Sequence, residues 1–293
     1  MIIVKLKAGL GNQLFQYATG RKLAIYHNTA LKLDISSFEG DSFRQYALSS
    51  FNVEETFASK EDMAAVFRVP ENKIARCFYR ICEFMRPHYR RHVFNERLLG
   101  IYDSSILKTG PTVYLNGYWQ SEKYFSDIRS ILLKEYSVKN PPDKVNSTVL
   151  ESISRIQSVS LHVRRADYIT HRNTAERYHV CDANYYARAV DYVVQRIVGD
   201  ISLFVFSDDM EWAKDHLKFE IPTFYVTHNL NKDCEDLRLM RACKHNIIAN
   251  SSFGWWAAWL NDNPDKIIIA PKKYFKDTTL TMTDWYAEKW VRL

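Results

Sequence analysis

Short apolar strands alternate with helical segments through the second half of the chain, and this alternation limits the possible fold more than any other feature. The stretches between most of these strands have helical periodicity and run for roughly 10–15 residues. Strands that are apolar on both faces are typical of parallel sheets covered by helices on each side. The sequence therefore predicts a parallel α/β sheet. Its expected strands are SVSLHV (158–163), ISLFVF (201–206), TFYVT (223–227), HNIIAN (245–250) and KIIIA (266–270).

The beginning of the chain has the pattern of half a Rossmann fold. Residues 2–6 (IIVKL) predict a strand, which the turn Gly9-Leu10-Gly11 follows. Apolar periodicity predicts a helix over 13–26, and ALKLD (30–34) predicts a second strand. This order of strand, turn, helix and strand is that of a Rossmann-like half.

The linker between two domains is expected at Asn140-Pro141-Pro142, because paired prolines exclude helix and favour extended chain. Before it, residues 57–135 are expected to be mostly helical and irregular, with one helix that begins near Ser121. We therefore predict two Rossmann-like domains, an N-terminal one over 1–142 and a C-terminal one over 143–293.

Composition is ordinary for a globular protein, with 46% hydrophobic and 25% charged residues in a chain of 293. The opening MIIVKLKAGLG lacks the features of a signal peptide, and no uncharged apolar run is long enough to span a bilayer. The five cysteines are scattered without a C-x-x-C pair, so we expect reduced thiols and no zinc site. These features predict a cytoplasmic protein. The net charge of +6 suits an anionic substrate or a membrane surface.

Two adjacent arginines follow the strand at 158–163. Ligands of open α/β sheets bind at the carboxyl ends of the strands, which is where Arg164 and Arg165 fall. Their planar, permanently charged guanidinium groups can hold a diphosphate through paired hydrogen bonds. The alternative is a solvated pair of arginines beside Asp167.

A second candidate phosphate site follows the strand that ends at Asn250. Ser251 or Ser252 is expected to cap a new helix, and the free N–H groups of a helix N-terminus attract phosphate. The alternative is that the serine only caps its own helix. Since this site and the arginines both follow parallel strands, we expect them to meet at one edge of the sheet. The tryptophans of this helix are expected to pack in the core.

Carboxylates also follow the strand at 201–206. Asp208 or Asp209 is expected to cap the next helix, with hydrogen bonding to substrate hydroxyls as the alternative. The chain contains no D-x-D motif, which is the usual carboxylate pair that holds a metal–nucleotide diphosphate. Arginines and a helix N-terminus can supply the same positive charge, so we expect neither a metal nor a cofactor.

The Gly9-Leu10-Gly11 turn does not complete a dinucleotide fingerprint, because Leu14 stands where the third glycine belongs. The two glycines are expected to shape a tight turn. Asn12 then lies at the end of the first strand, either as a helix N-cap or as a substrate contact.

Three segments together resemble the signatures of the bacterial α-1,2-fucosyltransferases of glycosyltransferase family 11: AGLGNQLFQYA (8–18), HVRRADY (162–168) and IIANSSFGWWAAWL (247–260). The similarity extends to LKLDISSF, NGYWQSEKYF and KIIIAPKKYF, so it covers nearly the whole chain. Ala8 departs from the family, which usually has a glycine there.

This resemblance implies a GT-B-like fold, in which two Rossmann-like domains face each other across a cleft. The donor GDP-β-L-fucose would bind the C-terminal domain. We expect the N-terminal domain to form the acceptor side of the protein, and the acceptor would be a galactose-terminated oligosaccharide or surface glycan. Arg164, supported by Arg165, would bind the β-phosphate, His162 would lie near the nucleoside, and Asp236 would contact guanine. The alternative for Asp236 is an acidic residue of a first helical turn. The other expected donor-site residues are Asp208, Asn250, Ser251, Ser252 and Phe253.

The implied reaction is an inverting transfer of L-fucose to O2 of galactose, with Arg164 stabilising charge on the departing GDP. Asp167, His171 and Asn12 are candidates for the groups at the acceptor hydroxyl, although an asparagine can only orient it. Lactose, N-acetyllactosamine and Gal-GalNAc ends all suit the reaction. A fucosyltransferase of other regiochemistry, a sulfotransferase with a nucleotide phosphosulfate donor and a nucleic-acid-binding protein are the alternatives.

Residues 71–97 predict a basic amphipathic helix that ends at Pro87. Ile74, Phe78, Ile81 and Met85 recur at helical spacing, while Arg76 and Arg80 lie off that stripe. We expect the stripe to pack on the core and the arginines to face water. The alternative is peripheral contact with an anionic membrane surface, such as the inner membrane.

Overall fold

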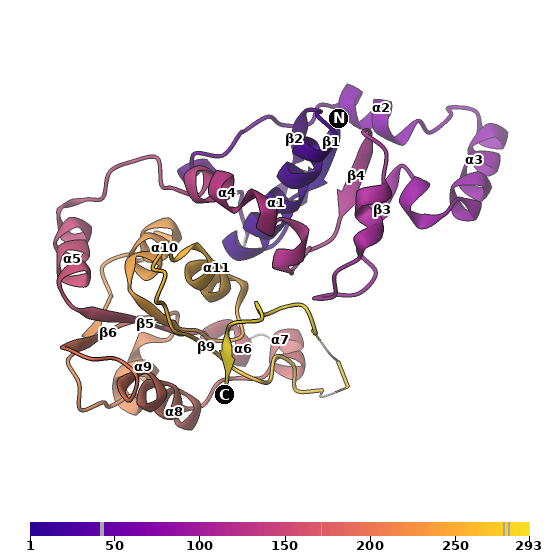
Figure 1. Ribbon diagram of the computed structural model, residues 1–293. Helices are drawn as coiled ribbons and strands as arrows, with labels where there is room; N and C mark the ends of the chain where they lie inside the picture. Colours follow the sequence, from indigo (N-terminus) through magenta and orange to yellow (C-terminus); the bar gives the residue numbers. More distant parts are fainter. Residues whose placement is uncertain (42–43, 171, 278, 281) are drawn as a thin grey trace. The chain divides into compact units, whose positions relative to one another are not determined.

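The computed structural model describes residues 1–41, 44–170, 172–277, 279–280 and 282–293, without the side chains of Asp167 and Asn173 (Figure 1). The chain divides into two compact units. The first contains Met1–Tyr136 with Thr283–Trp285, and the second contains Ser137–Met282 with Tyr286–Leu293. The proline pair thus falls just inside the second unit.

The first unit is built on a four-stranded parallel sheet in the order β2-β1-β4-β3. Its strands are β1 Ile2–Lys5, β2 Leu31–Asp34, β3 Val93–Asn95 and β4 Val113–Asn116. Its α-helices are α1 Leu10–Tyr26, α2 Lys60–Phe67, α3 Lys73–Met85 and α4 Arg129–Glu135.

Helix α1 begins three residues before the predicted start, because Gly9 is the N-cap residue. The alternative that Asn12 caps this helix is therefore wrong. Ala8 has φ of 64°, which lies in the left-handed region that favours glycine. This backbone conformation explains why glycine is usual at that position of the resembled family.

The helix predicted near Ser121 starts less regularly than expected. Ser121 does act as an N-cap, since its hydroxyl accepts from the N–H of Lys123 at 3.3 Å. The turns that follow are 3₁₀, however, and the α-helix α4 begins only at Arg129. The extended φ of −150° at Phe125 interrupts the helix between the two turns.

The second unit has a six-stranded, wholly parallel sheet in the order β10-β9-β8-β5-β6-β7. This is the strand order of a Rossmann sheet. Successive strands of the chain are added to one side of β5 up to β7, and from β8 onward they are added to the other side. Its strands are β5 Gln157–Val163, β6 Ile201–Ser207, β7 Thr223–Tyr225, β8 His245–Ile247, β9 Ile268–Ala270 and β10 Val291–Arg292. The predicted parallel α/β fold with two Rossmann-like halves is confirmed.

Helices cover both faces of this second sheet, which explains why its strands are apolar throughout (Figure 1). Helices α5, α10 and α11 lie on one face, and α8 and α9 lie on the other (Figure 1). The helices of the second unit are α5 Lys144–Arg155, α6 Ala166–Thr170, α7 Arg172–Arg177, α8 Ala183–Val194, α9 Met210–His216, α10 Asp233–Ala242 and α11 Ser252–Leu260.

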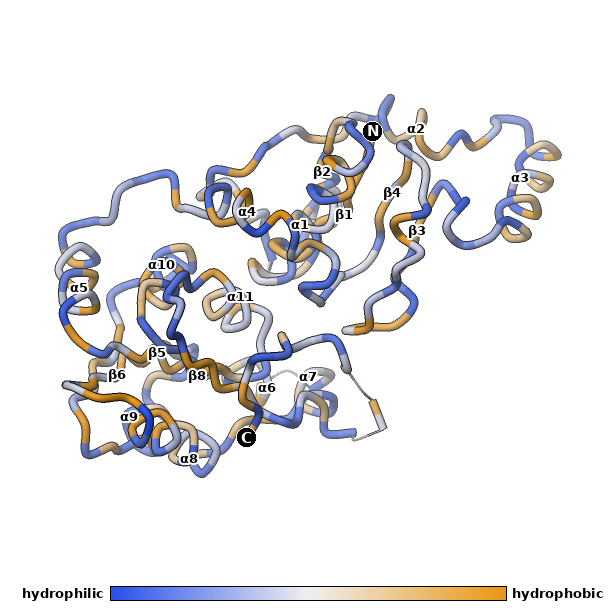
Figure 2. The backbone as a smooth tube through the Cα atoms, in the orientation of Figure 1, coloured by the Kyte–Doolittle hydropathy of each residue, from blue (hydrophilic) through white to orange (hydrophobic). Residues whose placement is uncertain are grey.

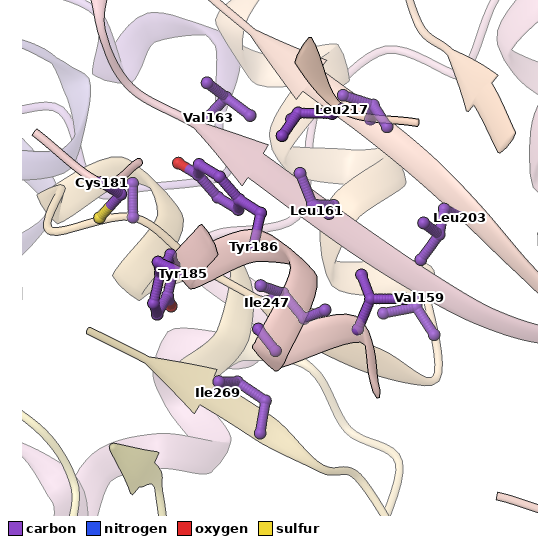
Figure 3. Close-up of a cluster of buried hydrophobic side chains, with 14 of the residues drawn as sticks. Val159, Leu161, Val163, Cys181, Tyr185, Tyr186, Leu203, Leu217, Ile247 and Ile269 are labelled. Atoms are coloured by element: carbon purple, nitrogen blue, oxygen red, sulfur yellow. The ribbon is translucent and has the colours of Figure 1, made fainter. Parts of the chain in front are cut away.

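The core of the second unit forms around β5. Val159, Leu161 and Val163 are at most 1% exposed and pack against Tyr186 of α8 and Leu203 of β6 (Figure 3). On the other face, Trp255 and Trp256 of α11 are fully buried, as predicted. This packing fixes the carboxyl end of β5, where the predicted phosphate-binding residues begin.

Helix α3 contradicts the expectation that its apolar stripe packs on the core. None of its residues is buried, and Ile74, Phe78 and Ile81 are 70%, 66% and 51% exposed. Within the described residues, no helix combines the length and apolarity required to cross a membrane.

Candidate functional site

The carboxyl ends of β5 and β8 form the switch point of the second sheet, where its strand order reverses. Ligands of doubly wound sheets bind at such a point, because the two neighbouring connections diverge to opposite faces. Arg164 follows β5 directly, and the N-cap residue of α11 follows β8 after a short loop. The predicted meeting of the arginines and the start of α11 at one sheet edge is thus confirmed.

Arg164 is held in place at this edge while remaining accessible. Its Nη1 atom lies 3.3 Å from Oδ2 of Asp208, and its side chain is 26% exposed. The guanidinium carbon also lies 6.0 Å from the ring centroid of Tyr168. Since β5 pairs with β6 in register up to Val163 and Ser207, Arg164 and Asp208 are neighbours at the two strand ends.

Arg165 occupies a different environment from its neighbour. Its guanidinium lies over the ring of Trp212 at 4.5 Å, and its Nε is 3.4 Å from Oδ2 of Asp209. Its backbone N–H donates to Oδ1 of Asp208 at 2.8 Å. The predicted supporting role for Arg165 therefore agrees with a side chain that is anchored on α9.

The two aspartates after β6 have different roles, and the sequence alone did not show which of them caps the next helix. Asp209 caps α9, because its Oδ1 accepts from the N–H of Trp212 at 3.2 Å. Asp208 bonds to Arg164 and to the backbone of Arg165. Its position supports the arginines, and its carboxylate is 21% exposed at the edge of the sheet.

Helix α11 begins with Ser251 as its N-cap, which resolves the choice between the two serines. The hydroxyl of Ser251 accepts from the N–H of Phe253 at 3.3 Å. Ser252 and Phe253 form the first turn and are partly exposed. The backbone N–H groups of such a first turn point out of the helix with the positive end of its dipole, which attracts anions.

His162 is buried directly beneath this helix start. The ring is 5% exposed, and burial lowers the pKa of His162 to about 3, with a smaller contribution from Arg164. The imidazole is therefore neutral near pH 7. Its centroid lies 5.6 Å from that of Phe253, and its Nδ1 has no hydrogen-bond partner among the described residues.

Gly254 is the residue that allows α11 to approach His162. A Cβ at this position would lie 2.6 Å from Nδ1 of the imidazole and 3.3 Å from Cβ of Ile248.

We expect Gly254→Ala to destabilise the protein by about 1–3 kcal/mol, because both neighbours are buried and cannot move freely. Calorimetric melting should show a Tm several degrees lower. Gly110→Ala is the matched control, since an added Cβ there meets nothing within 4 Å. Equal melting temperatures for both variants would contradict this close packing.

Asn250 does not lie where a residue in contact with the donor substrate is expected. Its side chain is fully buried, and its Nδ2 donates to the carbonyls of His179 and Tyr274 at 2.7 and 2.8 Å. Its own carbonyl accepts from the hydroxyl of Tyr168 at 2.9 Å. These bonds tie three segments together behind the site, which makes Asn250 a positioning residue.

Asp236 lies in the first part of α10, which begins after the β7 connection. Burial raises the pKa of Asp236 to about 7, and a hydrogen bond from Asn229 opposes part of this rise. That bond joins Nδ2 of Asn229 to Oδ1 of Asp236 at 3.0 Å. Asn229 in turn exchanges two hydrogen bonds with Asn146 of α5, at 2.9 and 3.0 Å. An ordinary helix-start acid is fully solvated, so this partly buried and oriented carboxylate stands out.

Sequence reasoning did not single out Asn146 and Asn229, which orient Asp236. The one signal for Asn146 was a polar residue inside a helix, and such residues are usually solvated. In the structure Asn146 is fully buried and Asn229 is 6% exposed. Only the contact between α5 and the loop before α10, which are distant in the sequence, reveals the pair.

The first unit has its own switch point, between β1 and β4. Asn12 follows β1 and Gln120 follows β4, and Nε2 of Gln120 donates to Oδ1 of Asn12 at 2.6 Å. Lys7 lies at the same edge, with Nζ at 3.4 Å from Oδ1 of Asn116 and 4.5 Å above the ring of Tyr118. Polar groups thus gather at the carboxyl edge of this sheet as well.

Glu96 lies behind these residues and was missed by the sequence analysis. Its carboxylate accepts from the N–H groups of Tyr118 and Trp119 at 2.7 and 3.0 Å. Burial raises the pKa of Glu96, while these hydrogen bonds oppose the rise. Glu96 therefore shapes the turn after β4 that carries Gln120.

Two of the predicted residues lie outside the described part of the chain: His171, and the side chain of Asp167. Within the described part, no group of three or more His, Cys, Asp or Glu side chains is arranged to hold a metal ion.

The family model of glycosyl transferase family 11 matches residues 1–293 of this chain. An alpha-1,2-colitosyltransferase of Escherichia coli is 30% identical, over 100% of this chain and 99% of its own length. The O-antigen biosynthesis glycosyltransferase WbnK of the same species is also 30% identical, over 96% and 98%. The galactoside 2-alpha-L-fucosyltransferase Sec1 of Mus musculus is 23% identical, over 92% of this chain and 67% of its own.

Among solved structures, an Arabidopsis thaliana FUT1 mutant in complex with GDP matches 92% of this chain and 70% of its own. The TM-score is 0.52 at 12% sequence identity. At this identity the likeness concerns the fold, and it agrees with the predicted GT-B-like class.

Proposed function

This chain belongs to glycosyl transferase family 11, and from that premise we propose that it transfers L-fucose from GDP-β-L-fucose to O2 of a terminal galactose. The observation that carries the proposal is the meeting of Arg164 with the start of α11 at one switch point. The two together offer a cationic fork and the backbone N–H groups of a helix N-terminus, which is what a diphosphate requires. Family membership favours glycosyl transfer over the sulfotransferase and nucleic-acid-binding alternatives.

The donor is proposed to lie along the carboxyl edge of the second sheet. Its β-phosphate bonds to Arg164 and to the first N–H groups of α11, at Ser252 and at Phe253, whose N–H then shares its 3.3 Å bond to the Ser251 hydroxyl with the phosphate. The guanine ring extends toward α10, where Asp236 accepts hydrogen bonds from the ring N–H and the exocyclic amine. The raised pKa of Asp236 supports this role, because a partly buried carboxylate without enough hydrogen-bond donors is suited to a ligand that brings two.

The reaction is proposed to be a single in-line displacement with inversion. The galactose O2 forms a bond to C1 of fucose while the bond from C1 to the β-phosphate oxygen breaks, and its electron pair leaves with GDP. Arg164 and the α11 N-terminus stabilise the charge that develops on the phosphate. The proton of O2 passes to a base, for which Asp167 remains the proposal, with Asn12 orienting the hydroxyl.

The carboxyl edge of the first sheet is proposed to contact the acceptor. Asn12 and Gln120 offer amide groups that can both donate and accept hydrogen bonds to sugar hydroxyls. Gln120 is 5% exposed, and its Oε1 is buried without a hydrogen-bond partner among the described residues. Asn12 is partly exposed, so its amide is the member of the pair that an acceptor hydroxyl would reach.

A colitosyl donor is the second candidate, because a relative that matches the whole chain carries the name of a colitosyltransferase. Colitose is fucose without its 3-hydroxyl, so the same phosphate and guanine contacts would serve both donors. The two proposals differ only in the sugar that is transferred.

A transfer assay tests this proposed function. GDP-fucose and the GDP derivative of colitose are each supplied with lactose, N-acetyllactosamine and a Gal-β1,3-GalNAc acceptor. We expect fucose on O2 of galactose in the α configuration, as read by NMR of the product. Transfer of colitose alone would replace the donor, and a product linked to another hydroxyl would overturn the regiochemistry.

Activity is expected to survive a chelator. Arg164 and the helix N-terminus supply the positive charge at the diphosphate, and the chain has no D-x-D motif. The initial rate should therefore be the same in excess EDTA as in added Mg²⁺ or Mn²⁺. Loss of transfer in EDTA that either ion restores would contradict this prediction.

A further inference from the structure

Helix α3 is attached to the first unit through its polar side. The hydroxyl of Tyr79 donates to the carbonyl of Phe67, and its ring stacks on that of His92 at 5.8 Å. One carboxylate oxygen of Glu83 accepts from the N–H of His92 at 3.0 Å, and the other contacts Arg86. A helix of a soluble protein normally turns its apolar side to the core, so α3 is oriented in the opposite way.

The apolar side of α3 consequently faces away from the unit. Ile74, Phe78, Ile81 and Met85 share one side of the helix by their spacing of three and four residues, and Phe84 borders them. Their exposed fractions range from 51% to 79%, and the helix contains no buried residue. Figure 2 shows α3 at the margin of the first unit, with apolar residues on its outer side. We call these five residues the α3 stripe.

Positive charge predominates in the segment that carries the α3 stripe. Residues 71–97 contain seven Lys and Arg but three Glu. Two of those glutamates are engaged, Glu83 with Arg86 and His92, and Glu96 with the backbone of the turn after β4. Arg91 lies beside the stripe, with its guanidinium 5.9 Å from the ring centroid of Phe84. The border of the stripe is therefore strongly cationic.

We propose that α3 docks this protein on an anionic lipid bilayer. The α3 stripe enters the boundary between headgroups and acyl chains, while Lys73, Arg80, Arg90 and Arg91 contact lipid phosphates. Charge complementarity favours this occupant over a second copy of the chain, because two copies that met along their stripes would bring their cationic borders together. The proposal concerns the first unit alone and does not depend on which sugar is transferred.

Vesicle co-sedimentation tests the docking. The full chain is mixed with vesicles of phosphatidylcholine alone or with added phosphatidylglycerol. We expect binding to the anionic vesicles that weakens with salt, since screening shortens the reach of the arginines to about 10 Å at 0.1 M. Replacing two stripe residues, Phe78→Glu with Ile81→Glu, should weaken this binding at least tenfold. The matched control is Val198→Glu, which changes a valine of the second unit that is 92% exposed. It should bind as the unaltered protein does.

Two native cysteines allow the contact of α3 with the bilayer to be measured directly. Cys77 and Cys82 are exposed on α3, at either edge of the stripe, and can carry an environment-sensitive fluorophore. Anionic vesicles should shift its emission to the blue, and Cys77→Ser with Cys82→Ser should remove that shift. The stripe variant should retain the Tm and the GDP affinity of the unaltered protein, so that loss of binding is not loss of folding.

Three results would overturn the proposal. The first is equal binding to neutral and anionic vesicles, and the second is undiminished binding of the stripe variant. The third is a lipid-free dimer in sedimentation velocity that the stripe variant dissociates, which would make a second copy the occupant.

Discussion

Replacing Arg164 with Lys is expected to lower turnover by about 10²–10³-fold, as removal of one oxyanion-hole donor does in other enzymes. Lysine keeps the charge but cannot bond two phosphate oxygens at once. Those bonds strengthen as the fucosyl bond breaks and charge moves onto GDP, so they belong mainly to the transition state. Steady-state kinetics should therefore show a large fall in kcat with a smaller change in the donor KM.

Arg165→Lys is the matched control for this experiment. Arg165 is the same residue type one position later, but its guanidinium lies on Trp212 and beside Asp209. We expect its replacement to cost about 1 kcal/mol or less, as for a partly exposed ion pair. Near-normal kcat with only a raised donor KM in Arg164→Lys would indicate that Arg164 stabilises the bound donor and the transition state equally. Normal values of both would remove Arg164 from the site.

Replacing Asp236 with Asn is expected to weaken GDP binding by about 1–3 kcal/mol, because a guanine donor is left without its acceptor. Titration calorimetry with GDP, inosine diphosphate and ADP measures the effect. Inosine diphosphate lacks the exocyclic amine, so the unaltered protein should prefer GDP to it. The variant should lose most of that preference.

The raised pKa of Asp236 gives this prediction a pH dependence. GDP requires the carboxylate form, so affinity should increase as the pH rises through about 7. The variant serves as the reference, since titration of the diphosphate itself is common to both proteins. In the ligand-free protein, stability depends on pH in the opposite direction to GDP affinity. Burial opposes the charged carboxylate of Asp236, so the free energy of unfolding falls as the pH rises through about 7.

Asp236→Asn should therefore melt at a higher temperature than the unaltered protein at pH 8 without ligand. A variant that is more stable but binds GDP more weakly cannot be explained by misfolding. Unchanged GDP affinity would show that Asp236 is only an acidic residue of the α10 first turn.

The second unit could be predicted almost strand by strand because its strands are apolar on both faces. Continuous apolar runs such as SVSLHV and ISLFVF are stable as strands that are buried on both faces, in a parallel sheet between two layers of helices. The start of α1 was misplaced for a local reason, since Gly9 caps the helix without a side-chain bond and leaves no sequence signal.

The candidate site was predictable where its residues follow strand ends, as Arg164 and Ser251 do. It was not predictable where function depends on contacts between distant segments. The Asn146–Asn229 pair that orients Asp236 joins α5 to the loop before α10, and Gln120 reaches Asn12 from the far end of the first unit's sequence. Periodicity identified the apolar side of α3 but carried no information about which way that side turns.

Amide hydrogen exchange with and without saturating GDP tests most directly the claim that a nucleoside diphosphate binds the switch point of the second sheet. The backbone N–H groups of Ser252 and Phe253 begin α11 and are the proposed phosphate donors. Their exchange should slow when GDP binds, together with exchange in the segment around Arg164. If GDP binds but slows exchange only elsewhere in the chain, the donor does not bind at the carboxyl ends of β5 and β8.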